Sequence, residues 1–273
     1  MSDSRVIAFI GVGRMGSALA RGLVAAGVPP ERIWASDADA SAARRLAEEI
    51  GVRVPGSNRE AVGDADTVVL AVKPQVAKSV LQDLAPALTE RHALVSIAAG
   101  ISTAQLADWS GLPARRIVRT MPNTPCLVGA GAVAMAIGPE TDADAAEAAR
   151  AVFEATSLVV TVDEKLIDAV TGLSGSGPAY VFLFLEALAD GGVAAGLSRE
   201  TAQSLAAQTV LGAAKMVVDL GAHPAQLRDQ VTSPGGTTVA GLGVLEERGF
   251  RSAVIEAVQA AARRSRELSE AVE

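Results

Sequence analysis

The chain is poor in the residues that metal sites, disulfides and hydrolytic triads require. Among its 273 residues there is one cysteine, Cys126, and there are two histidines, His92 and His223. A single thiol can form neither an internal disulfide nor a cysteine cluster for zinc, and it is typical of a reducing, cytoplasmic setting. His92 precedes a predicted strand and is expected to be exposed, whereas His223 precedes Pro224 and is expected in a loop. We therefore predict neither a metal site nor a serine hydrolase triad.

Positive charge, aromatic side chains and long apolar runs are scarce as well. The formal net charge is −7 at pH 7, which argues against the basic surface that non-specific nucleic-acid binding needs. Aromatic residues make up only 3% of the chain, so alanine, valine and leucine must fill the core. The apolar run at residues 6–10 ends at Gly11, too early for the core of a signal peptide. The longest apolar helical segment reaches Glu186 before it could span a membrane. We predict no nucleic-acid partner and no membrane association.

The first half of the chain alternates short apolar runs with helical patterns. Apolar residues at helical spacing predict helices at 15–27 and 41–51, each ending at a glycine. Runs that are apolar on both faces predict strands of a parallel sheet covered by helices on both sides. These runs are residues 5–10, 32–36, 67–73, 93–99 and 116–122, with 131–138 and 157–163 as strands that could complete the sheet. The pattern predicts an α/β fold with a doubly wound, Rossmann-type sheet over residues 1–163.

Beyond residue 163 the pattern becomes helical and predicts no further strand. Residues 178–196 and 199–221 have apolar side chains almost all round the predicted helices. Such helices must be buried, and a domain of ~110 residues has little interior in which to bury two of them. We therefore predict that residues 164–273 form an all-helical domain that joins two copies of the chain into an obligate homodimer.

Three glycines after the first predicted strand have the G-x-G-x-x-G spacing of a dinucleotide-binding turn: Gly11, Gly13 and Gly16. The first permits the tight turn, the second lets the backbone approach a pyrophosphate, and the third lets the helix pack closely on the strand. Arg14 and Met15 lie between the last two glycines, where the predicted helix begins and its N-terminus would face the anion. Because a strand precedes the turn and a helix follows it, we predict NADPH or NADH as the cofactor.

The choice between NADPH and NADH stays open. Asp37 follows the second predicted strand, about 20 residues after the glycine turn. An acidic side chain there can bond the ribose 2′-hydroxyl of NAD and would repel the 2′-phosphate of NADP. Ser36 and Asn58 could instead bond a 2′-phosphate. Asp37 could also simply cap the next helix.

Two further segments are predicted to line the cofactor, because ligands of open parallel sheets bind at the carboxyl ends of the strands. One is Ala98, at the end of the fourth predicted strand, where a small residue would let a nicotinamide ring come close. The other follows the third strand and consists of Ala71, Val72, Lys73 and Pro74. Lys73 could equally be a solvated residue at the end of its strand.

Five segments, taken in order along the chain, carry a family resemblance. They are FIGVGRMGSALARGL at 9–23, AVKPQ at 71–75, RTMPNTPCLVGAG at 119–131, GLSGSGPAYVFLFLEAL at 172–188 and QVTSPGGTTVAGLGVLE at 230–246. Together they closely resemble the pyrroline-5-carboxylate reductases over essentially the whole chain. The resemblance implies reduction of 1-pyrroline-5-carboxylate to L-proline by hydride from NADPH or NADH, the last step of proline biosynthesis. It also implies a helical domain through which subunits interlock into a dimer, and in some members a ring of dimers.

The resemblance gives roles to residues of the last segment. Thr238 is implied to be the catalytic hydroxyl that bonds the ring nitrogen of the substrate. The backbone amides of Gly236, Thr237 and Thr238, with the hydroxyl of Ser233, would hold the substrate carboxylate. Such a site needs no cation if a helix N-terminus supplies the positive end of its dipole. The local pattern predicts that Pro234 ends one helix and that Thr237 and Thr238 begin the next.

Asn123, in the segment MPNTP, is placed near the nicotinamide by the same resemblance. Ser174 and Ser176 would form a polar break between helices near the site, although a helix cap before Pro178 explains them equally well.

Two other functions fit the same sequence features. A related imine reductase or a β-hydroxyacid dehydrogenase would share the two-domain plan, and the dehydrogenase would need a catalytic lysine, for which Lys215 is the candidate. The chain has few histidines and lysines, which favours an imine substrate, because an iminium is already electrophilic and needs positioning more than a strong base. A non-catalytic dinucleotide-binding protein is the second alternative, and the intact TSPGGTT loop disfavours it.

Overall fold

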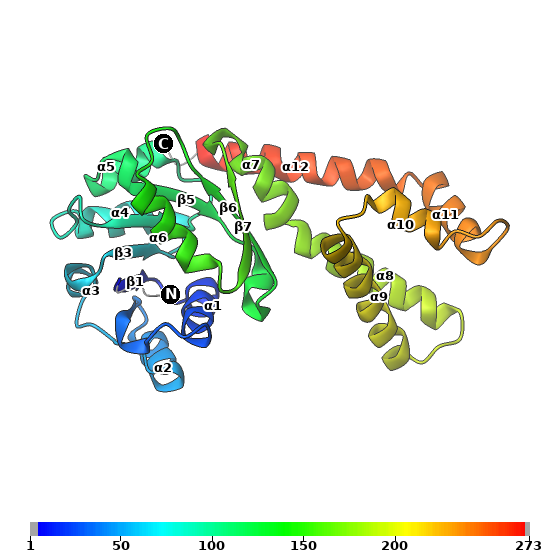
Figure 1. Cartoon of the computed structure of the whole chain (residues 1–273), viewed down its shortest axis with the longest axis horizontal. Helices are drawn as coiled ribbons and strands as arrows, with labels where there is room; N and C mark the ends of the chain where they lie inside the picture. Colours follow the sequence, from blue (N-terminus) through cyan, green and yellow to red (C-terminus); the bar gives the residue numbers. More distant parts are fainter. Residues whose placement is uncertain (1–4, 271–273) are drawn as a thin grey trace. The chain divides into compact units, whose positions relative to one another are not determined.

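The computed structural model describes residues 5–270 and divides the chain into two compact units (Figure 1). The first unit extends to Ser176 and takes in the C-terminal segment from Ala260 onward, while the second comprises Gly177–Gln259. The boundary predicted from the sequence, between residues 163 and 164, lies before this division. The C-terminal segment, predicted with the helical domain, is grouped with the first unit.

A seven-stranded sheet forms the centre of the first unit, with the strand order β2-β1-β3-β4-β5-β6-β7. All seven predicted strands are present, each shorter than its apolar run. Their bounds are β1 Ile7–Ile10, β2 Ile33–Ser36, β3 Thr67–Leu70, β4 Ala93–Ser96, β5 Ile117–Met121, β6 Gly131–Ala136 and β7 Ser157–Val162. The first five pair in parallel, which confirms the predicted α/β fold.

Strand β6 departs from the parallel arrangement, because it runs antiparallel to β5 while β7 pairs in parallel with β6. The connection from β5 to β6 is residues 122–130, most of which form a short 3₁₀ helix at Thr124–Val128. A parallel crossover needs a dozen or more residues, usually with a helix, so this short connection can only return the chain antiparallel. The longer segment between β6 and β7 contains helix α6 and restores the parallel direction.

Helices cover both faces of the sheet. Their bounds in the first unit are α1 Arg14–Ala25, α2 Ala40–Ile50, α3 Asn58–Asp64, α4 Pro74–Leu84, α5 Thr103–Ser110, α6 Ala143–Phe153 and α7 Ile167–Val170. Short 3₁₀ segments occur at Pro30–Arg32, Ala114–Arg116 and Glu164–Leu166, and a π-helical segment occurs at Thr171–Gly175.

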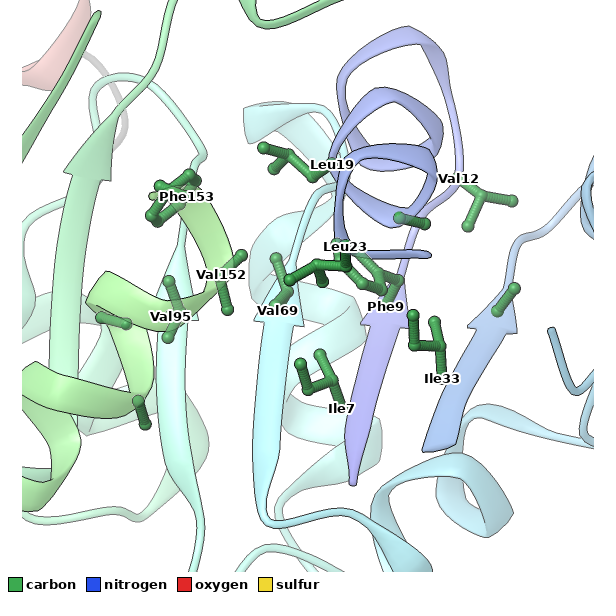
Figure 2. Close-up of a cluster of buried hydrophobic side chains, with 14 of the residues drawn as sticks. Ile7, Phe9, Val12, Leu19, Leu23, Ile33, Val69, Val95, Val152 and Phe153 are labelled. Carbon is green, nitrogen blue, oxygen red and sulfur yellow. The ribbon is translucent and has the colours of Figure 1, made fainter. Parts of the chain in front are cut away.

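Alternate residues of each strand enter different cores. Ile7 and Phe9 of β1 pack with α1, α2 and α6, as Figure 2 shows for the α1 and α6 side chains. Ala8 and Ile10 of the same strand pack on the opposite face with α3, α4 and α5. Because successive side chains of a strand point to opposite faces, apolar residues at every position bury both faces of the sheet.

Local signals determine where several helices begin and end. Asp39, Ser57 and Ser102 precede α2, α3 and α5, and each side chain accepts a hydrogen bond from a backbone amide of the first turn. Gly51 and Gly111 end α2 and α5 in the left-handed conformation that glycine adopts without steric cost. Because the first five strands are parallel, their carboxyl ends and the starts of the helices that follow them lie at the same edge of the sheet.

The second unit is helical, and residues 164–270 contain no strand, as predicted. Its helices are α8 Gly177–Ala194, α9 Arg199–Leu220, α10 Pro224–Gln230, α11 Thr237–Glu247 and the first part of α12, which runs from Phe250 to Glu270. Helices α8 and α9 pack through small side chains, Ala189, Ala202 and Ala206. Large apolar side chains of the unit stay exposed in the single chain, among them Phe182, Leu183, Leu205, Leu211 and Val218.

His92 contradicts the expectation that it is exposed, because its side chain is completely buried. The amide of Thr89 donates to Nδ1 at 2.9 Å, so the neutral ring carries its proton on Nε2, which lies 3.1 Å from the carbonyl oxygen of Val62. Val62 belongs to α3, thirty residues earlier, and this long-range contact is not visible in the local sequence. Burial lowers the pKa of His92 below its usual value of 6.5, and the two backbone partners only partly offset the effect.

The burial of neutral His92 predicts a pH-dependent stability. The unfolded chain takes up a proton at His92 near pH 6.5, whereas the folded chain takes it up only at lower pH, so stability falls as the pH drops below 6.5. We expect His92 to contribute up to about 1.4 kcal/mol per pH unit to the slope of the unfolding free energy. Urea denaturation between about pH 8 and about pH 5 measures this slope. The His92→Gln variant should lose this part of the slope, and His223→Gln, at an exposed histidine, should keep it; equal slopes in all three proteins would contradict the prediction.

Candidate active site

The turn between β1 and α1 is built on close backbone contacts. Gly11 has a φ of +100°, and a Cβ atom on it would lie 2.6 Å from the carbonyl oxygen of Ala71 at the end of β3. A Cβ atom on Gly16 would lie 2.3 Å from the carbonyl oxygen of Gly11. Neither position can accept a side chain without moving the backbone. The first glycine therefore makes the tight turn, and the third brings α1 close to the end of β1, as the predicted roles require.

The N-terminus of α1 has the form of an anion site. Gly13 is the N-cap residue, no side chain caps the helix there, and the first turn contains no acidic residue. A Cβ atom on Gly13 would meet nothing within 4 Å, so the backbone is open to a group that approaches it. The first amides of a helix carry the positive end of its dipole, which favours a phosphate at this position.

A groove of about 670 Å³ runs along the carboxyl ends of β1, β2 and β3. Eight of the predicted cofactor residues line it: Gly11, Gly13, Ser36, Asp37, Asn58, Ala71, Val72 and Lys73. Arg14, Met15 and Gly16 continue from the groove into α1, and Pro74 is the first residue of α4. Ala98 and Asn123 are not among the residues that line the groove. The structure thus gathers most of the predicted residues into one cavity of the size that binds small molecules.

Asp37 braces the glycine turn. Its Oδ2 accepts a hydrogen bond of 2.8 Å from the amide of Val12, between Gly11 and Gly13, and its Oδ1 accepts one of 2.9 Å from the amide of Asp39. The alternative role of Asp37 as cap of the next helix is wrong, because Asp39 caps α2 through the Ser41 amide. Hydrogen bonds from the Ser41 hydroxyl and amide also lower the pKa of Asp39. Asp37 therefore places a negative charge in the groove while it holds the turn.

Ser36 and Asn58 form a polar pair beside Asp37. The hydroxyl of Ser36 donates to Oδ1 of Asn58 at 2.6 Å, which joins the end of β2 to the start of α3. Both residues line the groove. A hydroxyl and an amide can donate hydrogen bonds to a ribose hydroxyl or a phosphate. This pair is therefore compatible with the 2′-phosphate of NADP, whereas the negative charge of the neighbouring Asp37 favours the 2′-hydroxyl of NAD.

Lys73 lines the groove and is exposed to solvent, so both readings that the sequence left open stay possible. It is the N-cap residue of α4, with Pro74 at the first helical position, and no side chain caps this helix. Its own side chain is exposed at the rim of the groove that it lines. A solvated lysine at this place adds positive charge next to the uncapped start of a second helix.

Ala98 and Asn123 follow β4 and β5, the strands next to those that form the groove. Ala98 is buried just after β4, where its amide donates to the hydroxyl of Ser96. Asn123 joins two elements, because its Nδ2 donates to the carbonyl oxygen of Ser174 at 3.1 Å and its Oδ1 accepts from the amide of Ala132 at 2.9 Å. The proximity of either residue to a nicotinamide ring stays a prediction.

The segment around Ser174 and Ser176 separates α7 from α8, as the predicted break would, but it remains helical. Residues 171–175 form a π-helical turn between α7 and α8, and Ser176 has the dihedral angles of a right-handed helix. The chain therefore continues in helical conformation into Pro178. Single π-helical turns are frequent at functional sites, and no residue pattern in the sequence indicated this one.

The predicted substrate loop lies in the second unit. Gly236 is the N-cap residue of α11, which begins at Thr237 and has neither a side-chain cap nor an acidic residue in its first turn. The amide of Gly236 donates to the carbonyl oxygen of Ser233, and Gly235 has a φ of +69°. A Cβ atom on Gly236 would lie 2.4 Å from the hydroxyl oxygen of Ser233, so that hydroxyl sits directly beside the helix start.

Pro234 does not end the preceding helix, contrary to the prediction. Helix α10 ends at Gln230, where Val231 is the C-cap residue. The hydroxyl of Thr232 donates to the carbonyl oxygen of Arg228 at 2.6 Å, so a polar side chain satisfies a carbonyl of the last turn before proline is reached. Pro234 instead lies in the turn that leads to Gly236.

We also looked for a metal site, a membrane-spanning helix and a buried catalytic lysine among the described residues. The described residues include no group of three or more histidines, cysteines, aspartates and glutamates placed to hold a metal ion. Within residues 5–270, none of the helices combines the length and apolar character of a membrane-spanning segment. Lys215 is 69% exposed and forms an ion pair with Asp219 one turn later in α9, so nothing in this chain buries it.

Comparison with known proteins decides the family. A family model described as pyrroline-5-carboxylate reductase dimerisation matches residues 164–268, and one described as NADP oxidoreductase, coenzyme F420-dependent, matches residues 6–100. A pyrroline-5-carboxylate reductase of Arabidopsis thaliana is 51% identical over 98% of this chain and 97% of its own length. The chain belongs to the pyrroline-5-carboxylate reductase family. The resemblance carried by the five sequence motifs is thereby confirmed.

Solved pyrroline-5-carboxylate reductases have the same fold. The structure from Coxiella burnetii is 40% identical, with a TM-score of 0.92 over 97% of this chain and 99% of that one. A pyrroline carboxylate reductase of Plasmodium falciparum, solved with NADP bound, is 35% identical, with a TM-score of 0.84 over 97% and 98% of the two chains. This pyrroline-5-carboxylate reductase family member is therefore an oxidoreductase with a Rossmann-type domain, and it carries the dimerisation domain of the family.

The position of Asp37 predicts its influence on cofactor choice. Asp37→Asn removes the negative charge beside Ser36 but keeps an oxygen that can accept from the Val12 amide. We expect the ratio of kcat/KM for NADPH to that for NADH to rise about tenfold. Asp37→Ser should raise the same ratio but weaken both cofactors, because the brace on the glycine turn is lost. Steady-state kinetics with both cofactors test this, and an unchanged ratio in both variants would refute the role of the charge.

Proposed function

We propose that this chain reduces 1-pyrroline-5-carboxylate to L-proline with NADPH or NADH, as the last step of proline biosynthesis in the cytoplasm. The observation that carries the proposal is full-length similarity to pyrroline-5-carboxylate reductases, and the local geometry of two sequence signatures supports it. One signature forms the glycine turn at the groove, and the other forms the uncapped start of α11.

The groove would hold the adenosine and pyrophosphate parts of the cofactor. Its fit rests on the open backbone at Gly13 and on the uncapped α1 N-terminus, where the pyrophosphate would accept hydrogen bonds from the first amides. Ser36, Asn58 and Asp37 would contact the adenosine ribose, and Lys73 would add positive charge at the rim. We include Arg14, Met15, Gly16, Ala71, Val72, Pro74, Ala98 and Asn123 among the residues of the cofactor site. When bound, the reduced nicotinamide supplies the hydride.

The start of α11 would hold the substrate carboxylate. The amides of Thr237 and Thr238 have no intrahelical partners at this end of the helix, and the hydroxyl of Ser233 lies beside them. The Gly236 amide, which would join them at the carboxylate, donates to the carbonyl oxygen of Ser233 in this structure. The dipole of α11 would supply the positive potential that a chain of net charge −7 lacks globally. One carboxylate would be enough to accept the hydrogen bonds of these amides.

Thr238 would act at the ring nitrogen. Hydride addition to the carbon of the C=N bond turns that bond into a single bond and leaves the electron pair on nitrogen, which requires one proton there. The hydroxyl of Thr238, in the first turn of α11, would bond this nitrogen and supply or relay the proton. Pre-organised contacts and one hydroxyl are sufficient because the substrate is already electrophilic.

The helical domain would form a homodimer that completes each site. The exposed apolar side chains of α8 and α9 are more extensive than an isolated domain can leave in water, and the family model over residues 164–268 is a dimerisation domain. We assign residues 1–163 to cofactor binding and 164–273 to dimerisation and substrate binding. The dimer is also the unit from which a ring of dimers would be built.

The oxidation of reduced cofactor in the presence of defined substrates tests the proposed function. Purified protein is mixed with NADPH or NADH and either 1-pyrroline-5-carboxylate, other cyclic imines or a panel of hydroxyacids. Selective turnover of 1-pyrroline-5-carboxylate to proline supports the proposal. Faster turnover of another imine or of a hydroxyacid would favour a related reductase, and cofactor binding without any turnover would favour a binding protein.

The proposed role of Thr238 predicts a selective loss of turnover. Thr238→Ala should lower kcat by about 10²- to 10⁴-fold, because a positioned hydroxyl at the ring nitrogen is lost. The affinity for NADPH, measured by fluorescence titration, should stay within about twofold of wild type, since the groove is untouched. Thr238→Ser keeps a hydroxyl and should recover most of the activity. Wild-type turnover in Thr238→Ala would remove Thr238 from the mechanism.

The proposed dimer predicts the effect of a charge on α9. Leu211 is 61% exposed in the single chain, and Leu211→Asp would bury a carboxylate if this residue lies in the interface. We expect the dimer dissociation constant to rise at least about a hundredfold, measured by sedimentation at several concentrations. Glu200→Gln, at an exposed polar position of the same helix, is the matched control. A stable monomer in the wild type would refute the dimer itself.

A further inference from the structure

The C-terminal end of α12 belongs to the same compact unit as the sheet. Residues from Ala260 onward are grouped with this unit, although α12 begins at Phe250 in the other one. Helix α12 lies in the segment predicted to be helical, but the sequence analysis gave no bounds for a helix here. In Figure 1 its final turns lie beside α7, and this contact involves specific side chains of the first unit.

Ser265 anchors these final turns to α7. Its side chain is only 8% exposed, and its hydroxyl donates to Oδ1 of Asp168 at 2.7 Å. Asp168 follows Ile167, which is buried against Ala134 and Ala136 of β6. The hydrogen bond is charge-assisted and links residues far apart in the chain, so it holds the end of α12 to α7, which packs on β6.

One turn after Ser265, the helix meets the loop that follows β4. Ser269 donates through its hydroxyl to the carbonyl oxygen of Ser265. A Cβ atom on Gly100 would lie 3.6 Å from the hydroxyl oxygen of Ser269 and 3.7 Å from its Cα atom. Gly100 is buried and has a φ of +76°, so the loop turns sharply where the helix covers it. The last turn of α12 therefore forms a wall against this loop.

The loop in question, residues 97–102, lies at the edge of the sheet where the cofactor would bind. Strand β4 is the neighbour of β3, and β1, β2 and β3 provide the groove. The ribose-contacting residues follow β2, and the pyrophosphate turn follows β1. The remaining end of a dinucleotide therefore extends toward β3 and β4, and the loop that holds Ala98 faces the nicotinamide end.

We propose that Ser265 and Asp168 are positioning residues for the nicotinamide half of the cofactor. Their hydrogen bond keeps the last turn of α12 on Gly100 and thereby holds the loop after β4 in place. Neither residue touches the reacting atoms, and both act through the backbone of Ala98–Ile101. The inference rests on the proposed use of a nicotinamide cofactor, but it does not depend on which substrate the cofactor reduces.

Binding of whole and truncated cofactor tests the proposal. Ser265→Ala should weaken NADPH and NADH binding about three- to tenfold, as expected when one hydrogen bond that orders a contact loop is lost. ADP-ribose lacks the nicotinamide and should bind with unchanged affinity, because it contacts only the groove. Fluorescence titration measures the reduced cofactors, and calorimetry measures ADP-ribose. A merely structural role would weaken all three ligands together.

Conservative and control variants separate the hydrogen bond from the fold. Ser265→Thr and Asp168→Asn retain a donor and an acceptor and should keep most of the NADPH affinity, whereas Asp168→Ala should reproduce the effect of Ser265→Ala from the other partner. Ser252→Ala removes an exposed hydroxyl of the same helix, bonded to Glu256, and should change nothing. Equal losses for NADPH and ADP-ribose, or no loss in Ser265→Ala and Asp168→Ala, would overturn the proposal. A selective loss of NADPH affinity in a protein that does not reduce 1-pyrroline-5-carboxylate would support it and contradict the proposed function instead.

Discussion

The close approach of α1 to the end of β1 is the constraint on which the rest of the nucleotide unit depends. A methyl group on Gly16 would collide with the carbonyl oxygen of Gly11, and one on Gly11 would collide with that of Ala71. Because both contacts are to backbone, no rearrangement of side chains could relieve them. The same contacts bring the first amides of α1 to the edge of the sheet, where Asp37 holds the Val12 amide. Packing and anion binding are therefore two consequences of one turn.

Helix starts supply the local positive potential in an acidic chain. Helices α1, α4 and α11 begin without a side-chain cap, at Gly13, Lys73 and Gly236 respectively. Capped starts elsewhere, such as those of α2 and α5, satisfy their amides internally. A cap would compete with a ligand for the same amides, so the uncapped starts are the ones suited to anions. In a chain of net charge −7, these helix starts are places where local positive potential is available to an anion.

In a single chain, the helical unit does not bury its large apolar side chains. Its helices pack through alanines, while many large apolar side chains remain in contact with solvent. In the nucleotide unit the large apolar residues are buried on both faces of the sheet. Burial of apolar area is the main favourable contribution to folding. The two units therefore differ in how much of their apolar area a single chain buries. The first has its own core, and the second leaves apolar side chains exposed, in keeping with the match of residues 164–268 to a dimerisation domain.

The sequence by itself determined the strands, the glycine turn and the apolar helices. These features depend on local periodicity and on positions that only glycine can occupy. The order of elements and most residues of the groove followed from that pattern. Only the tertiary structure decided the antiparallel direction of β6, the burial of His92, the brace formed by Asp37, and the anchoring of Ser265 on Asp168. It also showed that α10 ends at Gln230, four residues before Pro234. Except for that helix end, these features join residues distant in the chain or depend on the length of a connection, and a pattern of neighbouring residues contains no record of which distant groups will meet.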